Sequence, residues 1–138
     1  LAVFTGPHTY VSATWYTNPY MGSTWNYMSV HCNGIIRFLD DAALESVLRK
    51  TTLHFENYNQ RSSTVFDNLD PAYMQKLMTA IVAFEIEVVK MNHVFKLSQD
   101  RDEESYRHIQ EKLKAQGGDG EVIAAEMKKR TKDLFPGE

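Results

Sequence analysis

Residues 4–16, FTGPHTYVSATWY, and residues 23–34, STWNYMSVHCNG, decide the fold of this chain. Side chains of two kinds alternate along residues 8–15, and a period of two predicts a β-strand with two distinct faces. Residues 24–38 predict a second long strand, in which Gly34 indicates a bulge or a close backbone approach. One face of this second strand carries Trp25, Tyr27, Ser29 and His31.

The segment that holds these two strands is uncharged and aromatic. Before Asp40 the only charged side chain is Arg37, and the segment contains half of the protein's aromatic side chains. These are Phe4, Tyr10, Trp15, Tyr16, Tyr20, Trp25, Tyr27 and Phe38. Thr, Ser, Asn and His lie between them. Rings and short hydrogen-bonding side chains on paired strands are typical of a binding surface for a planar polar ligand.

Helices and a second pair of strands are predicted after Asp40. Asp40 and Asp41 indicate the start of a helix that runs to Phe55, and Asp70-Pro71 repeats this start pattern. Val82–Val89 predicts a half-buried strand, and Met91-Asn92-His93 predicts a hairpin turn into residues 94–98. The inward side chains of the Val82–Val89 strand are expected to be Phe84, Ile86 and Val88. Charged helices are expected at 99–116 and, capped by Asp119, up to about Leu134.

Length and composition bound the class of protein. The chain has 138 residues and a net charge of −3, which fits one globular domain and gives no general attraction for nucleic acid. Cys32 is the single cysteine, which excludes an internal disulfide and suits a cytoplasmic location. No stretch reaches the roughly 20 apolar residues of a membrane span. Leu1–Thr5 reads as the middle of a strand, so further N-terminal sequence is expected.

Three ordered motifs carry a resemblance to a known family. They are the Gly6–Tyr16 segment, the Thr24–Gly34 segment and FKLSQDR at residues 95–101. The chain resembles the PaiB family, the FMN-binding negative transcriptional regulators, over essentially its whole length. Ala13 stands where the family usually has Pro, and Asp100 where Asn is usual. Neither difference removes a charged or aromatic contact.

The resemblance implies a fold that is mainly β with flanking helices (β+α). The expected fold is an FMN-binding split β-barrel like that of the pyridoxamine-phosphate oxidases, with some N-terminal strands outside this chain. Residues 1–138 are expected to form a single domain, in which 1–98 supply barrel strands with two inserted helices and 99–138 form a C-terminal helical segment. The family's members are usually homodimers with flavin at the subunit interface. The implied role is that of a negative transcriptional or redox-responsive regulator.

The same resemblance suggests which residues hold FMN. Lys96 can give the phosphate a point charge, and Arg37 or Arg101 can add a charge-assisted pair. Short polar side chains can hold the phosphate, the ribityl chain or the polar edge of the ring. The expected cofactor-binding residues are Tyr10, Ser12, Trp15, Tyr16, Thr24, Trp25, Asn26, Tyr27, Lys96, Ser98 and Gln99. No residue is assigned a catalytic or metal-binding role.

Other functions have weaker support in the sequence. A flavin-dependent oxidoreductase of the pyridoxamine-phosphate oxidase type is the alternative, although Arg37 alone is no cationic cluster for a phosphorylated substrate. A haem-binding split barrel would need a histidine ligand, for which His8, His31 and His93 show no supporting spacing. DNA binding is possible, but the basic run at 128–132 near a helix end forms no recognisable motif. His31 cannot readily activate Cys32, because neighbours in a strand point to opposite faces.

Overall fold

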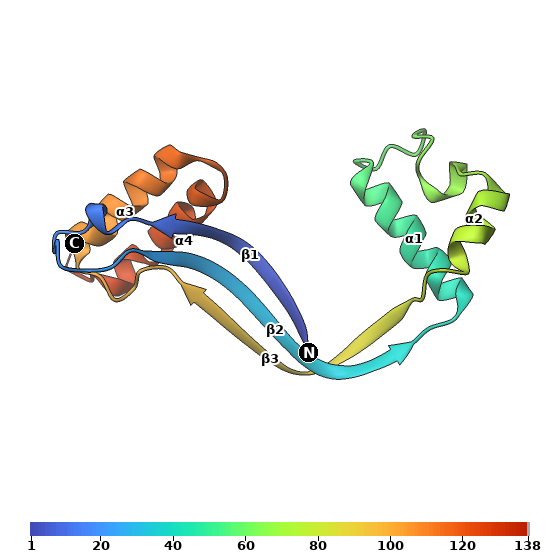
Figure 1. Cartoon of the computed structure of the whole chain (residues 1–138), viewed down its shortest axis with the longest axis horizontal. Coiled ribbons are helices and arrows are strands. Elements are labelled where there is room, and N and C mark those ends of the chain that lie inside the picture. The colour runs from blue at the N-terminus through green and yellow to red at the C-terminus, as the bar shows by residue number, and fades with distance from the viewer. Residues whose placement is uncertain (138) are drawn as a thin grey trace. The chain divides into compact units, whose positions relative to one another are not determined.

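Three strands form one antiparallel sheet in the order β1-β2-β3, and four α-helices accompany it (Figure 1). The computed structural model describes residues 1–137 of the chain. The elements are β1 (Ala2–Val11), the 3₁₀ turn η1 (Ala13–Trp15), β2 (Thr24–Phe38), α1 (Asp41–Phe55), the 3₁₀ turn η2 (Phe66–Asn68), α2 (Pro71–Met78), β3 (Phe84–Lys96), α3 (Glu103–Gln116) and α4 (Gly118–Leu134). The fold is therefore a mixture of α and β structure.

The chain divides into two compact units. Unit 1 contains residues 1–33 and the residues from Lys90 onward, and unit 2 contains Gly34–Val89. Strands β2 and β3 each contribute residues to both units. All eleven predicted cofactor-binding residues belong to unit 1.

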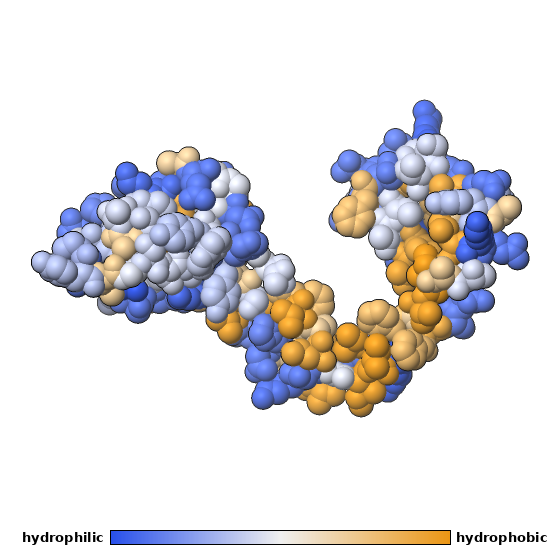
Figure 2. Space-filling view, in the orientation of Figure 1, coloured by the Kyte–Doolittle hydropathy of each residue, from blue (hydrophilic) through white to orange (hydrophobic). Residues whose placement is uncertain are grey.

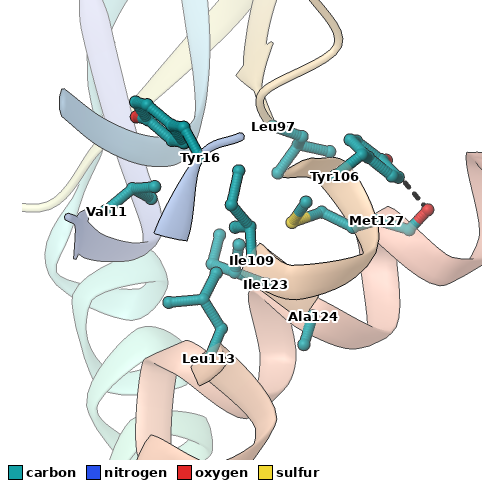
Figure 3. Close-up of a cluster of buried hydrophobic side chains, with 9 residues drawn as sticks. All are labelled: Val11, Tyr16, Leu97, Tyr106, Ile109, Leu113, Ile123, Ala124 and Met127. Atoms are coloured by element: carbon teal, nitrogen blue, oxygen red, sulfur yellow. Dashed lines mark hydrogen bonds between the residues drawn. The ribbon is translucent and has the colours of Figure 1, made fainter. Parts of the chain in front are cut away.

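The core of unit 1 lies between the sheet and helices α3 and α4 (Figure 3). The helices supply buried side chains at helical spacing, and the strands and their ends supply the rest. The cluster consists of Val11, Tyr16, Leu97, Tyr106, Ile109, Leu113, Ile123, Ala124 and Met127. The hydroxyl group of Tyr106 donates to the carbonyl oxygen of Met127 at 3.0 Å, and burial raises the pKa of Tyr106 to about 12. The bond satisfies the one polar group that Tyr106 brings into the core.

The register of β1 and β2 separates an inner face from an outer face. Thr9 pairs with Asn26, and both are buried on the side of the helices, where Gln116 donates to Thr9 Oγ1 at 3.1 Å. The next pair, Tyr10 with Trp25, points to the opposite side and is exposed. This alternation confirms the two faces expected from the sequence for this part of the sheet.

Unit 2 is built on the end of β2 and the start of β3. The N–H group of Leu39 donates to the carbonyl oxygen of Ala83 at 2.9 Å, just beyond the two strand ends. Asp40 caps α1 by accepting from the N–H group of Ala43 at 2.9 Å, as the sequence indicated. Asp70 caps α2 in the same way, with Pro71 at the first helical position.

Two strand predictions were wrong. The chain makes no hairpin at Met91–His93, because β3 continues from Phe84 to Lys96. A tight hairpin favours residues with positive φ, and none of the residues of that tripeptide has one. The first strand ends at Val11 rather than near Trp15, because the Ser12 side chain accepts from the N–H group of Thr14 and starts η1.

Both C-terminal helices begin later or differently than expected. Helix α3 starts at Glu103 rather than Gln99, because Ser98 has a φ of 60° and turns the backbone sharply before Asp102 caps the helix. Helix α4 starts at Gly118 after Gly117, and Asp119 does not cap it.

Phe84 and Val88 of β3 were expected to point inward, yet they are 54% and 47% exposed in this chain.

We expect the Asp102 cap to stabilise unit 1 in a pH-dependent way. Asp102 accepts from the N–H group of Ser105 at 2.8 Å and from Thr17 Oγ1 at 3.1 Å, so it joins α3 to the loop before β2. Hydrogen bonds from the backbone and hydroxyl group of Ser105 lower the pKa of Asp102. Loss of such a cap costs about 1–2 kcal/mol. Asp102→Ala should therefore lower the free energy of unfolding by that amount at pH 7.

The pH dependence follows from the sign of this shift. A carboxylate with a lowered pKa stabilises the fold above its ordinary value of about 3.9 and loses that effect as the pH falls through the lowered value. We expect urea unfolding at pH values from 7 to 2.5 to show that the free energies of unfolding of wild type and Asp102→Ala become more similar below about pH 4. Glu111→Ala, an exposed change on the same helix, is the control. A difference that stays constant over this range would contradict the role of the charged cap.

Candidate functional site

The outer face of β1 and β2 carries a cluster of aromatic rings. The ring centroid of Trp25 lies 6.1 Å from that of Tyr10 and 6.1 Å from that of His8. Tyr27 pairs with His8 across the two strands. Trp25 is 52% exposed, Tyr10 is 48% exposed and Tyr27 is 37% exposed. We name the side chains of His8, Tyr10, Trp25 and Tyr27 the aromatic face.

A shallow depression of about 380 Å³ continues the aromatic face along the same strands. Its lining contains His8 and Tyr27 together with Thr5, Ser29 and His31, and none of its residues is Asp, Glu, Lys or Arg. Ser29 Oγ and His31 Nε2 lie 3.4 Å apart. The depression therefore offers hydroxyl and imidazole groups beside exposed rings, as a planar polar ligand requires.

A lysine lies at the sheet end where β2 begins and β3 ends. Lys96 is exposed, and its Nζ donates to Thr24 Oγ1 at 2.5 Å. Gln99 uses both ends of its amide on the neighbouring backbone: its Oε1 accepts from the N–H group of Leu97 at 2.7 Å, and its Nε2 donates to the carbonyl oxygen of Phe95 at 2.5 Å. The structure thus brings together Lys96 and Thr24, while Gln99 braces the turn after β3.

Asn26 and Ser98 are predicted cofactor-binding residues whose polar side chains are bonded to each other in the interior. Asn26 is 0% exposed and Ser98 is 2% exposed. Ser98 Oγ donates to Asn26 Oδ1 at 3.0 Å, and Asn26 Nδ2 lies 3.7 Å from the sulfur of Met127. The pair ties the turn after β3 to the middle of β2. Their arrangement supports the position of the neighbouring Trp25 and Tyr27 on the outer face.

Three further predicted residues lie in or beside η1. Ser12 begins the turn, and Trp15 packs partly against the core of unit 1. Tyr16 is 8% exposed, and the guanidinium carbon of Arg101 lies 4.8 Å from the centroid of its ring. The Tyr16 hydroxyl group and Arg101 Nε are both buried without a hydrogen-bond partner within residues 1–137.

Sequence reasoning missed a contact that fixes one edge of the aromatic face. Asp119 Oδ2 accepts from the backbone N–H group of His8 at 3.1 Å and lies 3.7 Å from His8 Nδ1. The sequence predicted that Asp119 caps its own helix. In the structure its side chain instead accepts a hydrogen bond from the backbone of β1. The two residues are 111 positions apart, and no local pattern links them.

The donor set of unit 1 fits FMN. The isoalloxazine ring is planar and has a polar edge, which matches exposed rings beside Ser29, His31 and Thr5. The unpartnered Tyr16 hydroxyl group and Arg101 Nε show that polar groups of this unit lack a partner within it. Among residues 1–137, no three His, Cys, Asp or Glu side chains gather as a metal-binding group. No helix in that range is long and apolar enough to cross a membrane.

Comparisons with known proteins agree with this chemistry. A family described as "Putative FMN-binding domain" matches residues 1–90, and the cofactor it indicates is FMN. A relative from Bacillus subtilis (strain 168), named Protease synthase and sporulation protein PAI 2, is 34% identical over 115 residues. The match covers 82% of this chain and 54% of the relative. The chain therefore spans about half of the length of that relative.

Proposed function

This chain belongs to the FMN-binding domain family, as its three sequence motifs indicated, and from that premise we propose that it is a cytoplasmic FMN-binding regulator. We propose further that residues 1–138 form a split-barrel domain that works as a homodimer. The name of the relative includes sporulation, which is a cellular process rather than a reaction. The regulatory role is the one that the resemblance of the three motifs implies.

The aromatic face is the observation that carries the FMN proposal. Single exposed aromatic residues are common on protein surfaces, but a ring cluster beside an uncharged depression is typical of a ligand site. Trp25 is central, because it contacts both Tyr10 and His8. In this proposal Trp25, Tyr10 and Tyr27 stack against or flank the isoalloxazine ring.

The remaining predicted residues divide by their position. Thr24 and Lys96 are hydrogen-bonded to each other at the sheet end, and in this proposal they hold polar parts of the cofactor. Ser12, Trp15, Asn26, Ser98 and Gln99 hold the strand ends and the turn after β3 in place. When bound, FMN supplies reversible electron-transfer chemistry, and the residues of this chain bind and orient it.

Exposed apolar side chains support the split barrel and the homodimer. Figure 2 shows apolar residues gathered over the strands. The exposed ones include Ile35, Ile36 and Phe38 on β2 and Val88, Val89 and Met91 on β3. A sheet with so much exposed apolar area requires further packing, either from additional strands or from a second subunit.

Direct DNA binding has little support from the charges of α4. Lys129 and Arg130 both pair with Glu126, so two cations of the basic run are partly neutralised. Sequence-independent DNA binding depends on cations that can replace counterions along the phosphates. In the proposed function, regulation therefore acts through flavin binding or another protein.

A flavin titration tests the proposal. We expect FMN to bind the purified protein with quenching of flavin fluorescence, and Trp25→Ala to weaken binding by about 10–100-fold. Stacking of a planar heterocycle on an aromatic side chain contributes about 1–3 kcal/mol, which corresponds to that range. Tyr73→Ala removes a similarly exposed ring from α2 and should leave the affinity unchanged. A colourless protein that does not quench the fluorescence of added FMN would contradict the proposal.

A further inference from the structure

Arg101 occupies a nearly buried position at the sheet end where β3 finishes. Its side chain is only 12% exposed and lies against the ring of Tyr16. The N–H group of Arg101 donates to the carbonyl oxygen of Ser98 at 3.1 Å, and the left-handed backbone of Ser98 directs the chain into this position. Arginine is rarely buried unless its charge is compensated.

The hydrogen-bonding capacity of this guanidinium group is poorly used. Nη1 lies 3.0 Å from the sulfur of Met21, which is a weak acceptor, and Nη2 lies 3.4 Å from Asp100 Oδ2. The Asp100 side chain is 74% exposed, and its distance is long for a charge-assisted bond. Nε has no partner, and neither does the buried hydroxyl group of Tyr16.

The two unpartnered groups require the same kind of ligand. Burial raises the pKa of Tyr16, so its hydroxyl group stays protonated and can donate. Arg101 Nε is always a donor. A ligand with several acceptor oxygens and a negative charge would satisfy both groups and compensate the guanidinium charge. A water molecule would add no negative charge beside the guanidinium group to that of Asp100.

We propose that Arg101 and Tyr16 form a binding site for a phosphate group, with Met21 as its displaceable cover. This inference rests on the proposed function, because FMN carries a phosphate monoester. Free inorganic phosphate has the same chemistry and is the second source. Met21 lies in the loop between η1 and β2 and is 39% exposed, so moving it aside would expose little additional apolar surface.

Other cations of the chain are less suited to this site. Lys96 is exposed and already donates to Thr24. Arg37 belongs to unit 2 and pairs with Glu85 and Glu87, so its charge is balanced there. Arg101 combines burial, a stacked ring and an unused donor, which are the features of a preorganised oxyanion site.

The test compares FMN with riboflavin, which lacks the phosphate, in the full chain. Wild type should bind FMN at least about 10-fold tighter than riboflavin. Arg101→Met should reduce FMN affinity about 10–100-fold and leave riboflavin affinity nearly unchanged, because hydrogen bonds to charged groups have that strength. Tyr16→Phe keeps the ring in the core and should lose a smaller part of the FMN preference. Arg61→Met removes an exposed cation from unit 2 and is the control.

A phosphate titration by calorimetry without flavin separates the two sources. Loss of the FMN preference in Arg101→Met identifies the FMN phosphate as the ligand. Phosphate binding that Arg101→Met abolishes, with no preference for FMN over riboflavin, identifies free phosphate instead. Equal binding of both flavins with no phosphate binding leaves the proposed function intact and overturns this site. Failure of wild type to bind any flavin overturns the proposed function. The phosphate titration then shows whether Arg101 and Tyr16 still bind phosphate.

If Arg101→Met does not fold, Tyr16→Phe and Arg101→Lys give the same comparison.

Discussion

Gly34→Ala is expected to destabilise unit 2 by about 2–3 kcal/mol. A Cβ atom at this position would overlap the carbonyl oxygen of Glu87 and lie 2.7 Å from Ile86 Cγ2. The oxygen belongs to the backbone of β3, so the clash cannot be relieved by rotating a side chain. Relief requires β2 and β3 to separate locally, and overpacking of this kind typically costs about 1–3 kcal/mol.

Amide hydrogen exchange of Phe84–Val89 measures this effect in the strand concerned. The protection of these amides should fall in Gly34→Ala, while α3 and α4 of unit 1 keep theirs. Gly22→Ala is the matched control, because a Cβ atom there meets no atom within 4 Å. If the two alanine variants exchange alike, the close approach of β2 to β3 does not limit stability.

Leu113→Ala is expected to have the largest effect on unit 1, about 3–4 kcal/mol. Leu113 is 0% exposed in the core between α3, α4 and the sheet. Truncation removes buried methyl groups and leaves a cavity, because helices that already pack closely relax only in part. Leu→Ala changes in such cores cost about 2–5 kcal/mol.

Urea unfolding followed by tryptophan fluorescence reports this loss, because Trp15 packs against the same core. Val122→Ala on α4 is the control, since Val122 is 46% exposed and its truncation should change stability by about 0.5 kcal/mol or less. A loss in Leu113→Ala no greater than that of the control would show that this cluster is not the core of the unit.

Local chemistry made the first turns of α1 and α2 predictable. Asp40, Asp70 and Pro71 stand where the capping rules place them, and both helices begin there. The false hairpin at Met91–His93 has the opposite origin: Asn and His often occur in turns, but pairing with β2 keeps the strand extended. The positive φ of Ser98 could not be predicted, because no local pattern signals it and the side chain of Ser98 bonds to Asn26, 72 positions away.

The sequence could predict which segments form the candidate site, but not all of the contacts that position its side chains. Alternation in β2 correctly separates exposed Trp25 and Tyr27 from buried Asn26. Sequence gives no reason to expect that Asp119 binds the backbone of His8, or that Met21 covers Arg101. Both contacts join segments that are far apart in the chain.

The hydrogen bond from Leu39 to Ala83 has a consequence for how this architecture can vary. It closes the ladder between the end of β2 and the start of β3, so everything from Asp40 to Val82 is topologically an insertion into a single hairpin. Its two attachment points are already adjacent. Insertions at such points are accommodated at small entropic cost, which changes only slowly with length. The α1–α2 segment can therefore be lengthened, shortened or exchanged for a tight turn while the β1–β2 surface is kept.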